Sequence, residues 1–192
     1  MSFTYKTISN FLTDEECKEI LNFSFENLVF QPAEIISSGK YGVDNHARKS
    51  NIIFYPYYKK FPFLLEKTTK LLKDNINVKG FNLDYKHSEF QFTEYNVGDF
   101  FGWHTDKYHS KTTGFNRYCS IVIQLNDEYE NGDLELKVDE DKIVIVEKGI
   151  GNLTIFLSDM EHRVNTITGG NRYTLVNWVG LIKEIDYKKT LL

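Results

Sequence analysis

The feature that most constrains this chain is a series of short β-branched and aromatic runs in its C-terminal half. Clusters of turn-forming residues separate these runs, as in Asn131-Gly132-Asp133 and Gly169-Gly170-Asn171. Short runs with regular turn signals predict an antiparallel sandwich or barrel. The runs are Phe90–Tyr95, Cys119–Leu125, Leu134–Val138, Lys142–Val146, Leu153–Leu157 and Arg172–Val179.

The N-terminal part carries helical signals instead. Thr13 and Glu16 have the spacing of a capping box, which predicts a helix beginning near residue 14. Apolar residues recur every three or four positions from about Phe61 to Asp74, which predicts a second helix. Between the two helices, the polar stretch from Ser37 to Ser50 predicts a loop.

These elements predict an α+β fold in which N-terminal helices pack on a β-sandwich. The chain has 192 residues, of which 41% are hydrophobic, so it is long enough to bury a core without a disulfide or metal staple. No break in composition divides it. We therefore expect one domain over residues 1–192, with helical support over about 1–80 and the β core over about 81–182.

Charge and targeting signals limit the partners. The net charge is −4, which counts against binding to a phosphate backbone, so a nucleic-acid partner is not expected. The N-terminus lacks an apolar signal segment, and no stretch approaches the about 20 apolar residues of a membrane span. We therefore expect a cytoplasmic location and no membrane association. Cys17 and Cys119 are too few and too far apart for a disulfide framework or a thiolate zinc site.

The segment from Gly102 to Asp106 carries the first candidate metal ligands. On an extended strand, residues two apart face the same side, so His104 and Asp106 offer an imidazole and a carboxylate to one point. A third ligand has to come from elsewhere, and His162, shortly after a predicted strand, is the natural candidate. Two His and one carboxylate with open coordination positions suit non-haem Fe(II).

Arg172 opens a predicted strand that otherwise holds mostly Tyr, Thr, Leu, Val and Trp. A buried guanidinium is costly unless it meets an anion, and Arg binds carboxylates in a bidentate fashion. Arg172, Thr174, Val176 and Trp178 share one face by two-residue periodicity. The alternative is an Arg at a strand end, paired with a structural Asp or Glu.

Ordered motifs in this half of the chain resemble those of the Fe(II)/2-oxoglutarate-dependent dioxygenases, specifically the prolyl-4-hydroxylase-like branch. The resemblance covers roughly residues 81–180 and extends more weakly into the helices. His104 and Asp106 match the family's His-x-Asp pair, and Tyr95 stands nine positions before His104. The other matching motifs are the Arg-led strand Arg117–Asn126, the turn and strand Asn131–Leu136, and the closing segment His162–Arg172 followed by Trp178.

The resemblance implies a double-stranded β-helix, or jelly-roll, with Fe(II) at one mouth. It implies that His104, Asp106 and His162 bind the iron and, with Arg172, form the catalytic set. Arg172 would pair with the distal carboxylate of 2-oxoglutarate. The implied cofactors are Fe(II), 2-oxoglutarate and O₂. The implied reaction hydroxylates a substrate C–H bond and releases succinate and CO₂.

Further cosubstrate-binding candidates are Tyr95, Thr174 and Gln124, the last standing where relatives often have Tyr. A second Arg six residues beyond Arg172 would suggest the nucleic-acid demethylase branch. This chain has Trp178 at that position, so that branch is less favoured. The branch favours a prolyl residue in a peptide or protein as substrate. Two alternatives remain: a hydroxylase of a free amino acid or other small molecule, and a non-catalytic β-sandwich binding module in which the site residues are unrelated.

Overall fold

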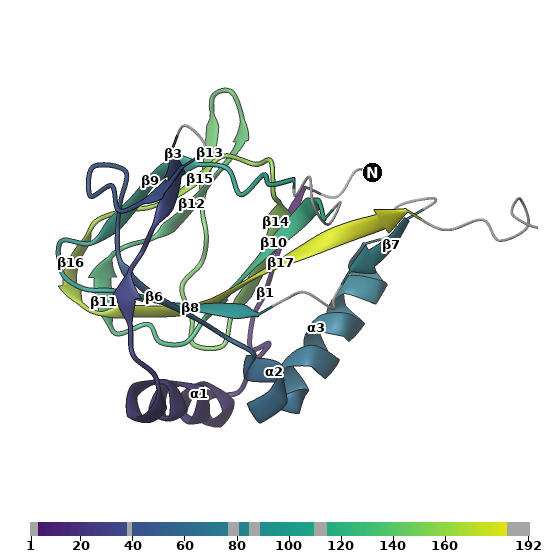
Figure 1. Ribbon diagram of the computed structural model, residues 1–192, viewed down its shortest axis with the longest axis horizontal. Helices are drawn as coiled ribbons and strands as arrows, with labels where there is room; N and C mark the ends of the chain where they lie inside the picture. The colour runs from purple at the N-terminus through teal and green to yellow at the C-terminus, as the bar shows by residue number, and fades with distance from the viewer. Residues whose placement is uncertain (1–3, 38–39, 77–80, 85–88, 110–114, 184–192) are drawn as a thin grey trace, which may run out of the picture.

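The structure, a computed structural model, describes residues 4–37, 40–76, 81–84, 89–109 and 115–183. Within these residues, a large and a smaller antiparallel sheet form two layers, and helices pack on the outer side of the large sheet (Figure 1). This mixed architecture confirms the predicted α+β fold class.

The helices are α1 (Asp14–Asn27), α2 (Tyr57–Lys60) and α3 (Pro62–Asn75). The predicted capping box is present at α1, because the Thr13 hydroxyl accepts from the Glu16 N–H at 3.2 Å and the Glu16 carboxylate accepts from the Thr13 N–H at 2.8 Å. Pro62 occupies the first turn of α3, where its missing N–H costs nothing.

The large sheet runs in the order β1-β14-β10-β17-β8-β6-β2, with β7 also pairing with β17. Every described pair in it is antiparallel. Its strands are β1 (Tyr5–Ile8), β2 (Gln31–Pro32), β6 (Asn51–Tyr55), β7 (Phe81–Asp84), β8 (Phe90–Tyr95), β10 (Arg117–Gln124), β14 (Leu153–Leu157) and β17 (Arg172–Lys183).

The smaller sheet runs in the order β13-β12-β15-β9-β5, and two further strand pairs, β11 with β16 and β3 with β4, complete the described β structure. The strands of the smaller sheet are β5 (Arg48–Lys49), β9 (Phe100–His104), β12 (Leu134–Asp139), β13 (Lys142–Ile145) and β15 (His162–Val164). The paired strands are β3 (Ile35–Ser37), β4 (Lys40–Gly42), β11 (Tyr129–Asn131) and β16 (Ile167–Gly170).

Both faces of the large sheet are buried, because strand side chains alternate between two apolar clusters. On β10, Ile121 and Ile123 pack with Ile20 of α1 and Leu64 of α3. Val122, between them in the sequence, packs instead into the cluster between the two sheets. This burial on both faces explains why the predicted strands are apolar runs rather than strict polar–apolar alternations.

The six predicted runs are found as β8, β10, β12, β13, β14 and β17, and β8 and β14 have the predicted bounds. The N-terminal part differs, because it also supplies β1, β2 and β6 to the large sheet and β5 to the smaller one. The predicted loop from Ser37 to Ser50 contains β4 and β5, and its residues 38–39 lie outside the described residues. β4 and β5, with three and two residues, are too short for a local pattern to reveal them.

Candidate active site

A cavity of about 1310 Å³ lies between the two sheets. Arg172, Thr174, Val176 and Trp178 all line it, as the two-residue periodicity of β17 predicts. His104 and His162 line it from the smaller sheet. The predicted site residues from distant parts of the sequence therefore meet at one cavity.

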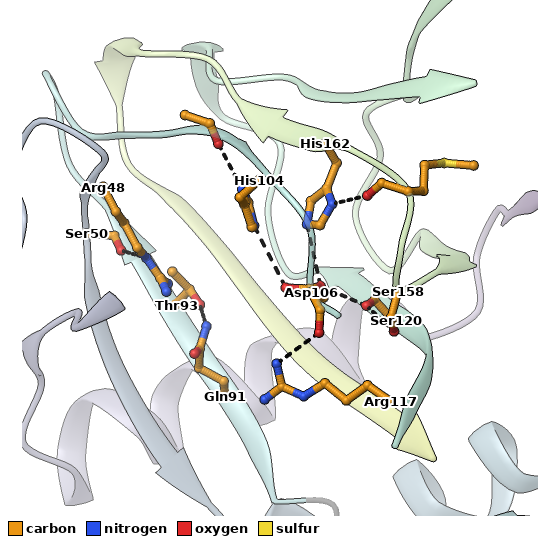
Figure 2. A network of polar contacts seen from close by, with 12 residues as sticks. Arg48, Ser50, Gln91, Thr93, His104, Asp106, Arg117, Ser120, Ser158 and His162 are labelled. Atoms are coloured by element: carbon orange, nitrogen blue, oxygen red, sulfur yellow. Dashed lines mark hydrogen bonds and ion pairs between the residues drawn. The ribbon is translucent and has the colours of Figure 1, made fainter. Parts of the chain in front are cut away.

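His104, Asp106 and His162 form a cluster in which one ligand atom of each lies within 4.8 Å of the others. The Nε2 atom of His104 is 3.8 Å from Asp106 Oδ1, and that of His162 is 3.5 Å from Asp106 Oδ2. Figure 2 shows the three side chains pointing toward one another. Two imidazole nitrogens and a carboxylate suit non-haem Fe(II), so the donor set fits the expected metal.

Backbone carbonyls orient both imidazoles. His104 Nδ1 lies 2.8 Å from the Gly102 carbonyl oxygen, and His162 Nδ1 lies 3.0 Å from that of Met160 (Figure 2). A carbonyl only accepts, so each Nδ1 carries the hydrogen and donates it. Each Nε2 then presents its lone pair to the cluster, which is the supporting arrangement that metal-binding histidines use.

A bulge in β9 brings two of its side chains to the same wall. His162 lies opposite His104 and Val164 lies opposite Phe101, so β9 spans one more residue than β15 between these pairs. The Phe101 and His104 rings stack with their centroids 3.4 Å apart and their planes at 13°. Gly102 lies inside the bulge, where its N–H donates to the Ala47 carbonyl at 2.8 Å and an added Cβ would come within 3.2 Å of that oxygen.

Asp106 lies beyond β9, which ends at His104, so the two do not share one regular strand as the spacing argument assumed. A hydrogen bond fixes the carboxylate instead: the Ser120 hydroxyl donates to Asp106 Oδ2 at 2.7 Å and lies 3.0 Å from the Ser158 hydroxyl (Figure 2). Ser120 is a buried supporting residue that no sequence motif indicated.

Ser120→Ala is expected to weaken Fe(II) binding by about 10- to 100-fold, the usual effect of losing a partner that orients a metal ligand. An Fe(II) titration under nitrogen measures this, with the thermal midpoint of the metal-free protein as the control for folding. Ser158→Ala is the matched control and should have the smaller effect, because Ser158 reaches Asp106 only through Ser120. Equal effects of the two variants would contradict this role.

The cluster is electrostatically poised for a cation. Burial, followed by repulsion from His162, lowers the pKa of His104 to about 3. For Asp106, burial works in the opposite direction, but the neighbouring His162 and His104 and the Ser120 hydrogen bond hold the pKa of its carboxyl below its usual range. A neutral His104 and an ionised Asp106 are the protonation states that metal coordination requires.

The pKa of His104 predicts an acid-sensitive metal-free protein. As the pH falls through about 6.5, the unfolded chain takes up a proton at His104, whereas the folded chain takes it up only near pH 3. Stability is therefore lost over this window, by up to about 1.4 kcal/mol per pH unit. Urea unfolding at about pH 7, 6 and 5 measures the slope. His104→Gln should remove this pH dependence of the unfolding free energy. His46→Gln, which changes an exposed histidine, is the control and should keep it. An unchanged slope in His104→Gln would contradict the prediction.

Arg172 lies fully inside the protein at 2% exposure. Its Nε has no hydrogen-bond partner within the part of the chain that the structure describes, and no carboxylate there lies within salt-bridge distance. Its guanidinium lies 5.4 Å from the centroid of the Tyr95 ring. The alternative of a structural Asp or Glu partner thus has no support, and a buried guanidinium without a carboxylate partner among the described residues fits a carboxylate ligand such as that of 2-oxoglutarate.

Two of the other cosubstrate candidates, Tyr95 and Thr174, line the cavity with Arg172, whereas Gln124 is not among its lining residues. Tyr95 lies opposite Arg172 in the β8/β17 register, and Gln124 lies opposite Thr174 in the β10/β17 register. The Gln124 Nε2 is a second buried side-chain donor without a partner among the described residues. Gln124 and Arg172 lie on the neighbouring strands β10 and β17.

Sequence reasoning missed Tyr129, which is buried near Arg172. Burial raises the pKa of the Tyr129 hydroxyl, and the charge and hydrogen bonding of the Arg172 guanidinium oppose this rise. Tyr129 follows a Leu-Asn-Asp-Glu segment rather than a recognisable motif, so no signal in the sequence pointed to it.

Residues 90–180 match the sequence profile of the 2OG-Fe(II) oxygenase superfamily. A PKHD-type hydroxylase of Psychrobacter sp. (strain PRwf-1) is 30% identical over 107 residues, which make up 53% of this chain and 41% of that protein. The chain spans about half the length of the first curated relatives it matches, namely 41%, 56% and 57% of three of them.

Solved structures give the same fold. A Pseudomonas putida prolyl-4-hydroxylase has a TM-score of 0.69 at 19% identity, covering 93% of each chain. A Trichoplax adhaerens prolyl hydroxylase, in complex with a hypoxia inducible factor oxygen degradation domain peptide fragment, has a TM-score of 0.75 at 19% identity, covering 93% of this chain and 84% of that one. At these identities the likeness shows the fold, which confirms the predicted jelly-roll.

A jelly-roll with two histidines and one carboxylate gathered at a cavity defines the class of Fe(II) oxygenases. Residues 90–180, the segment that holds these ligand candidates and Arg172, match the 2OG-Fe(II) oxygenase superfamily, and the PKHD-type relatives and prolyl hydroxylase neighbours support the resemblance to the prolyl-4-hydroxylase-like branch. These similarities support the expected enzyme class, an oxidoreductase. They also support the expected cofactors, Fe(II), 2-oxoglutarate and O₂, because the His104–Asp106–His162 cluster lies within the matched segment and its donor set suits Fe(II). Among the described residues, no helix combines the length and apolarity needed to cross a bilayer.

Proposed function

We propose that this chain is an Fe(II)- and 2-oxoglutarate-dependent hydroxylase that acts on a prolyl residue in a peptide or protein. The observation that carries the proposal is the meeting, at one cavity, of the His104–Asp106–His162 cluster and Arg172, which has no carboxylate partner among the described residues. The binding-module alternative requires these four residues to be unrelated, and their convergence argues against it. We also propose that residues 1–192 act as one domain, because strands from both halves of the chain pair within each sheet.

The roles of the residues follow from their positions. Bound Fe(II) with 2-oxoglutarate and O₂ supplies the oxidant that converts a substrate C–H to C–OH while 2-oxoglutarate becomes succinate and CO₂. His104, Asp106 and His162 would hold the metal by three ligands and leave the remaining positions open. Arg172 would bind the distal carboxylate and so orient the cosubstrate. The buried walls would keep bulk water from the reacting centre.

The prolyl substrate is supported by similarity and by the cavity. Several of the structural neighbours are prolyl hydroxylases, and one of them was solved with a peptide fragment. Phe54, Val176 and Trp178 give the cavity an apolar wall on the large-sheet side, which suits a pyrrolidine ring. The volume of about 1310 Å³ exceeds what a small cosubstrate fills, which leaves room for part of a second molecule.

A substrate screen tests the proposal. The purified chain is incubated with Fe(II), 2-oxoglutarate and a library of proline-containing peptides, and succinate release is measured together with the peptide masses. We expect succinate formation coupled to the gain of one oxygen atom, mapped to proline by fragmentation. Oxygen gained only by free amino acids, or only on another side chain, would contradict the prolyl assignment while leaving the hydroxylase assignment intact.

A further inference from the structure

At one side of the cavity, where the smaller sheet faces the large one, lies a buried polar group that the proposed chemistry does not use, and two of its members, Arg48 and Gln91, line the cavity. The group consists of Arg48, Ser50, Gln91 and Thr93, and we call it the Arg48 group. These residues are 1–7% exposed, and Figure 2 shows them together on one side of the His104–Asp106–His162 cluster. Arg48 Nε donates to Ser50 Oγ at 2.8 Å, and Gln91 Nε2 donates to Thr93 Oγ1 at 2.8 Å. Arg48 is the cation of this group.

Most of the binding capacity of Arg48 is unused. A guanidinium carries five N–H donors in a fixed fork, and the bond to Ser50 uses one of them. The Arg48 Cζ also lies over the face of the Phe101 ring, 4.5 Å from its centroid. Among the residues that the structure describes, no carboxylate lies within 4.0 Å of Arg48, whereas Arg163 pairs with Glu135 at 2.8 Å. A cation that is 93% buried without an anion is costly, so its retention indicates a ligand.

Arg48 is also close to the reaction centre. Arg48 lies opposite Phe101 in the β5/β9 register, and the Phe101 ring stacks on His104. One aromatic ring therefore separates the guanidinium from an expected iron ligand. Arg48 lines the same cavity as Arg172, but on the other sheet. With Arg172 assigned to 2-oxoglutarate, a second anion site at the cavity belongs to the other reactant.

We propose that Arg48 binds a carboxylate of the substrate and selects prolyl substrates that carry one next to the reacting ring. This inference rests on the proposed prolyl hydroxylation. The carboxylate has two possible sources with the same chemistry: the C-terminal carboxylate of a terminal proline, or the side chain of a neighbouring Asp or Glu. Either one completes the guanidinium fork with a bidentate pair, and Gln91 and Ser50 supply polar surroundings.

Binding is measured first, because it does not depend on turnover. Both tryptophans of the chain, Trp103 and Trp178, line the cavity, so their fluorescence reports ligand entry. The protein is saturated with Fe(II) and 2-oxoglutarate under nitrogen and titrated with N-acetylproline or with its neutral analogue N-acetylprolinamide. We expect the acid to bind about 10- to 100-fold more tightly than the amide.

Variants assign the preference to Arg48. Arg48→Met, which fills a similar volume without charge, should bind acid and amide equally, and Arg48→Lys should keep part of the preference because it keeps the charge. Lys49→Met is the matched control, because it removes one positive charge from the neighbouring position in the sequence. Lys49 is exposed, and its Nζ pairs with Asp99 Oδ1 at 3.0 Å. This variant should keep the full preference for the acid. Equal binding of acid and amide by the wild type, or a preference that persists in Arg48→Met, would overturn the proposal.

Turnover then separates the two sources of the carboxylate. Succinate release is compared for peptides that end in a free Pro carboxylate, for amidated peptides with Glu beside Pro, and for amidated peptides without an acidic residue. Faster turnover of either acidic series, lost in Arg48→Met, supports the proposal and identifies the source. Fastest turnover of the neutral series overturns it. Absence of hydroxylation on every peptide, together with the acid preference in the binding test, means that prolyl hydroxylation is wrong and that Arg48 still binds a carboxylate.

Discussion

His162→Ala is expected to leave the chain folded but to remove both iron binding and turnover. His162 is 5% exposed and supplies one of the three ligands that converge on one point. Without it, only His104 and Asp106 remain, and two ligands hold a divalent metal poorly. The loss should exceed the about 10- to 100-fold effect of removing a residue that merely orients a ligand, so succinate formation should fall to the background of the metal-free protein.

An Fe(II) titration under nitrogen checks this result directly. We expect one iron per wild-type chain and no stoichiometric binding by His162→Ala, with both proteins showing the same cooperative unfolding in urea. His46→Ala is the matched control, because it removes an exposed histidine far from the cluster in sequence. If His162→Ala bound iron as the wild type does, the assignment of His162 as a ligand would be wrong.

Arg172→Leu is expected to separate cosubstrate binding from stability. Truncating one partner of a buried charge pair costs about 2–5 kcal/mol, which corresponds to a roughly 30- to 5000-fold rise in the KM for 2-oxoglutarate. The metal-free variant without cosubstrate should be as stable as the wild type or more stable, because an apolar residue replaces a buried guanidinium that lacks an anion. Fe(II) binding should not change.

The 2-oxoglutarate dependence of succinate formation and urea unfolding of the cosubstrate-free protein check these two expectations. Arg172→Lys is the control variant: it keeps the charge but loses the planar fork, and its KM should lie between those of the wild type and Arg172→Leu. A KM for 2-oxoglutarate in Arg172→Leu within about twofold of the wild type would contradict a role for Arg172 in cosubstrate binding.

The sequence predicted the candidate ligands because their signals are short-range or motif-like. His104 and Asp106 stand two residues apart, and Arg172 opens an apolar strand. The physical reason given for the first pair was incomplete, since β9 ends at His104 and the Ser120 hydroxyl, rather than a regular strand, fixes Asp106. The spacing therefore indicated two residues that the structure brings into one cluster, although the chain between them is less regular than a single extended strand.

Other parts of the site depend on strand pairing between distant segments. Arg48 reaches the cavity because β5 pairs with β9, and the Phe101 ring stacks on His104 because a bulge shifts the register against β15. Two-residue strands such as β5 have no periodicity to detect. Tyr129 approaches Arg172 from a short strand, β11, that pairs with β16. These placements follow from the tertiary fold, and a single sequence does not contain them as local patterns.

Crystallisation of the protein with Fe(II) and 2-oxoglutarate under nitrogen, with anomalous data collected at the iron edge, tests the central claim most directly. We predict one anomalous peak, bound by His104 Nε2, Asp106 and His162 Nε2 at about 2.0–2.3 Å, in the range of other divalent metals with these ligands. The distal carboxylate of 2-oxoglutarate should contact the Arg172 guanidinium. Iron bound elsewhere, or 2-oxoglutarate bound away from Arg172, would contradict the account.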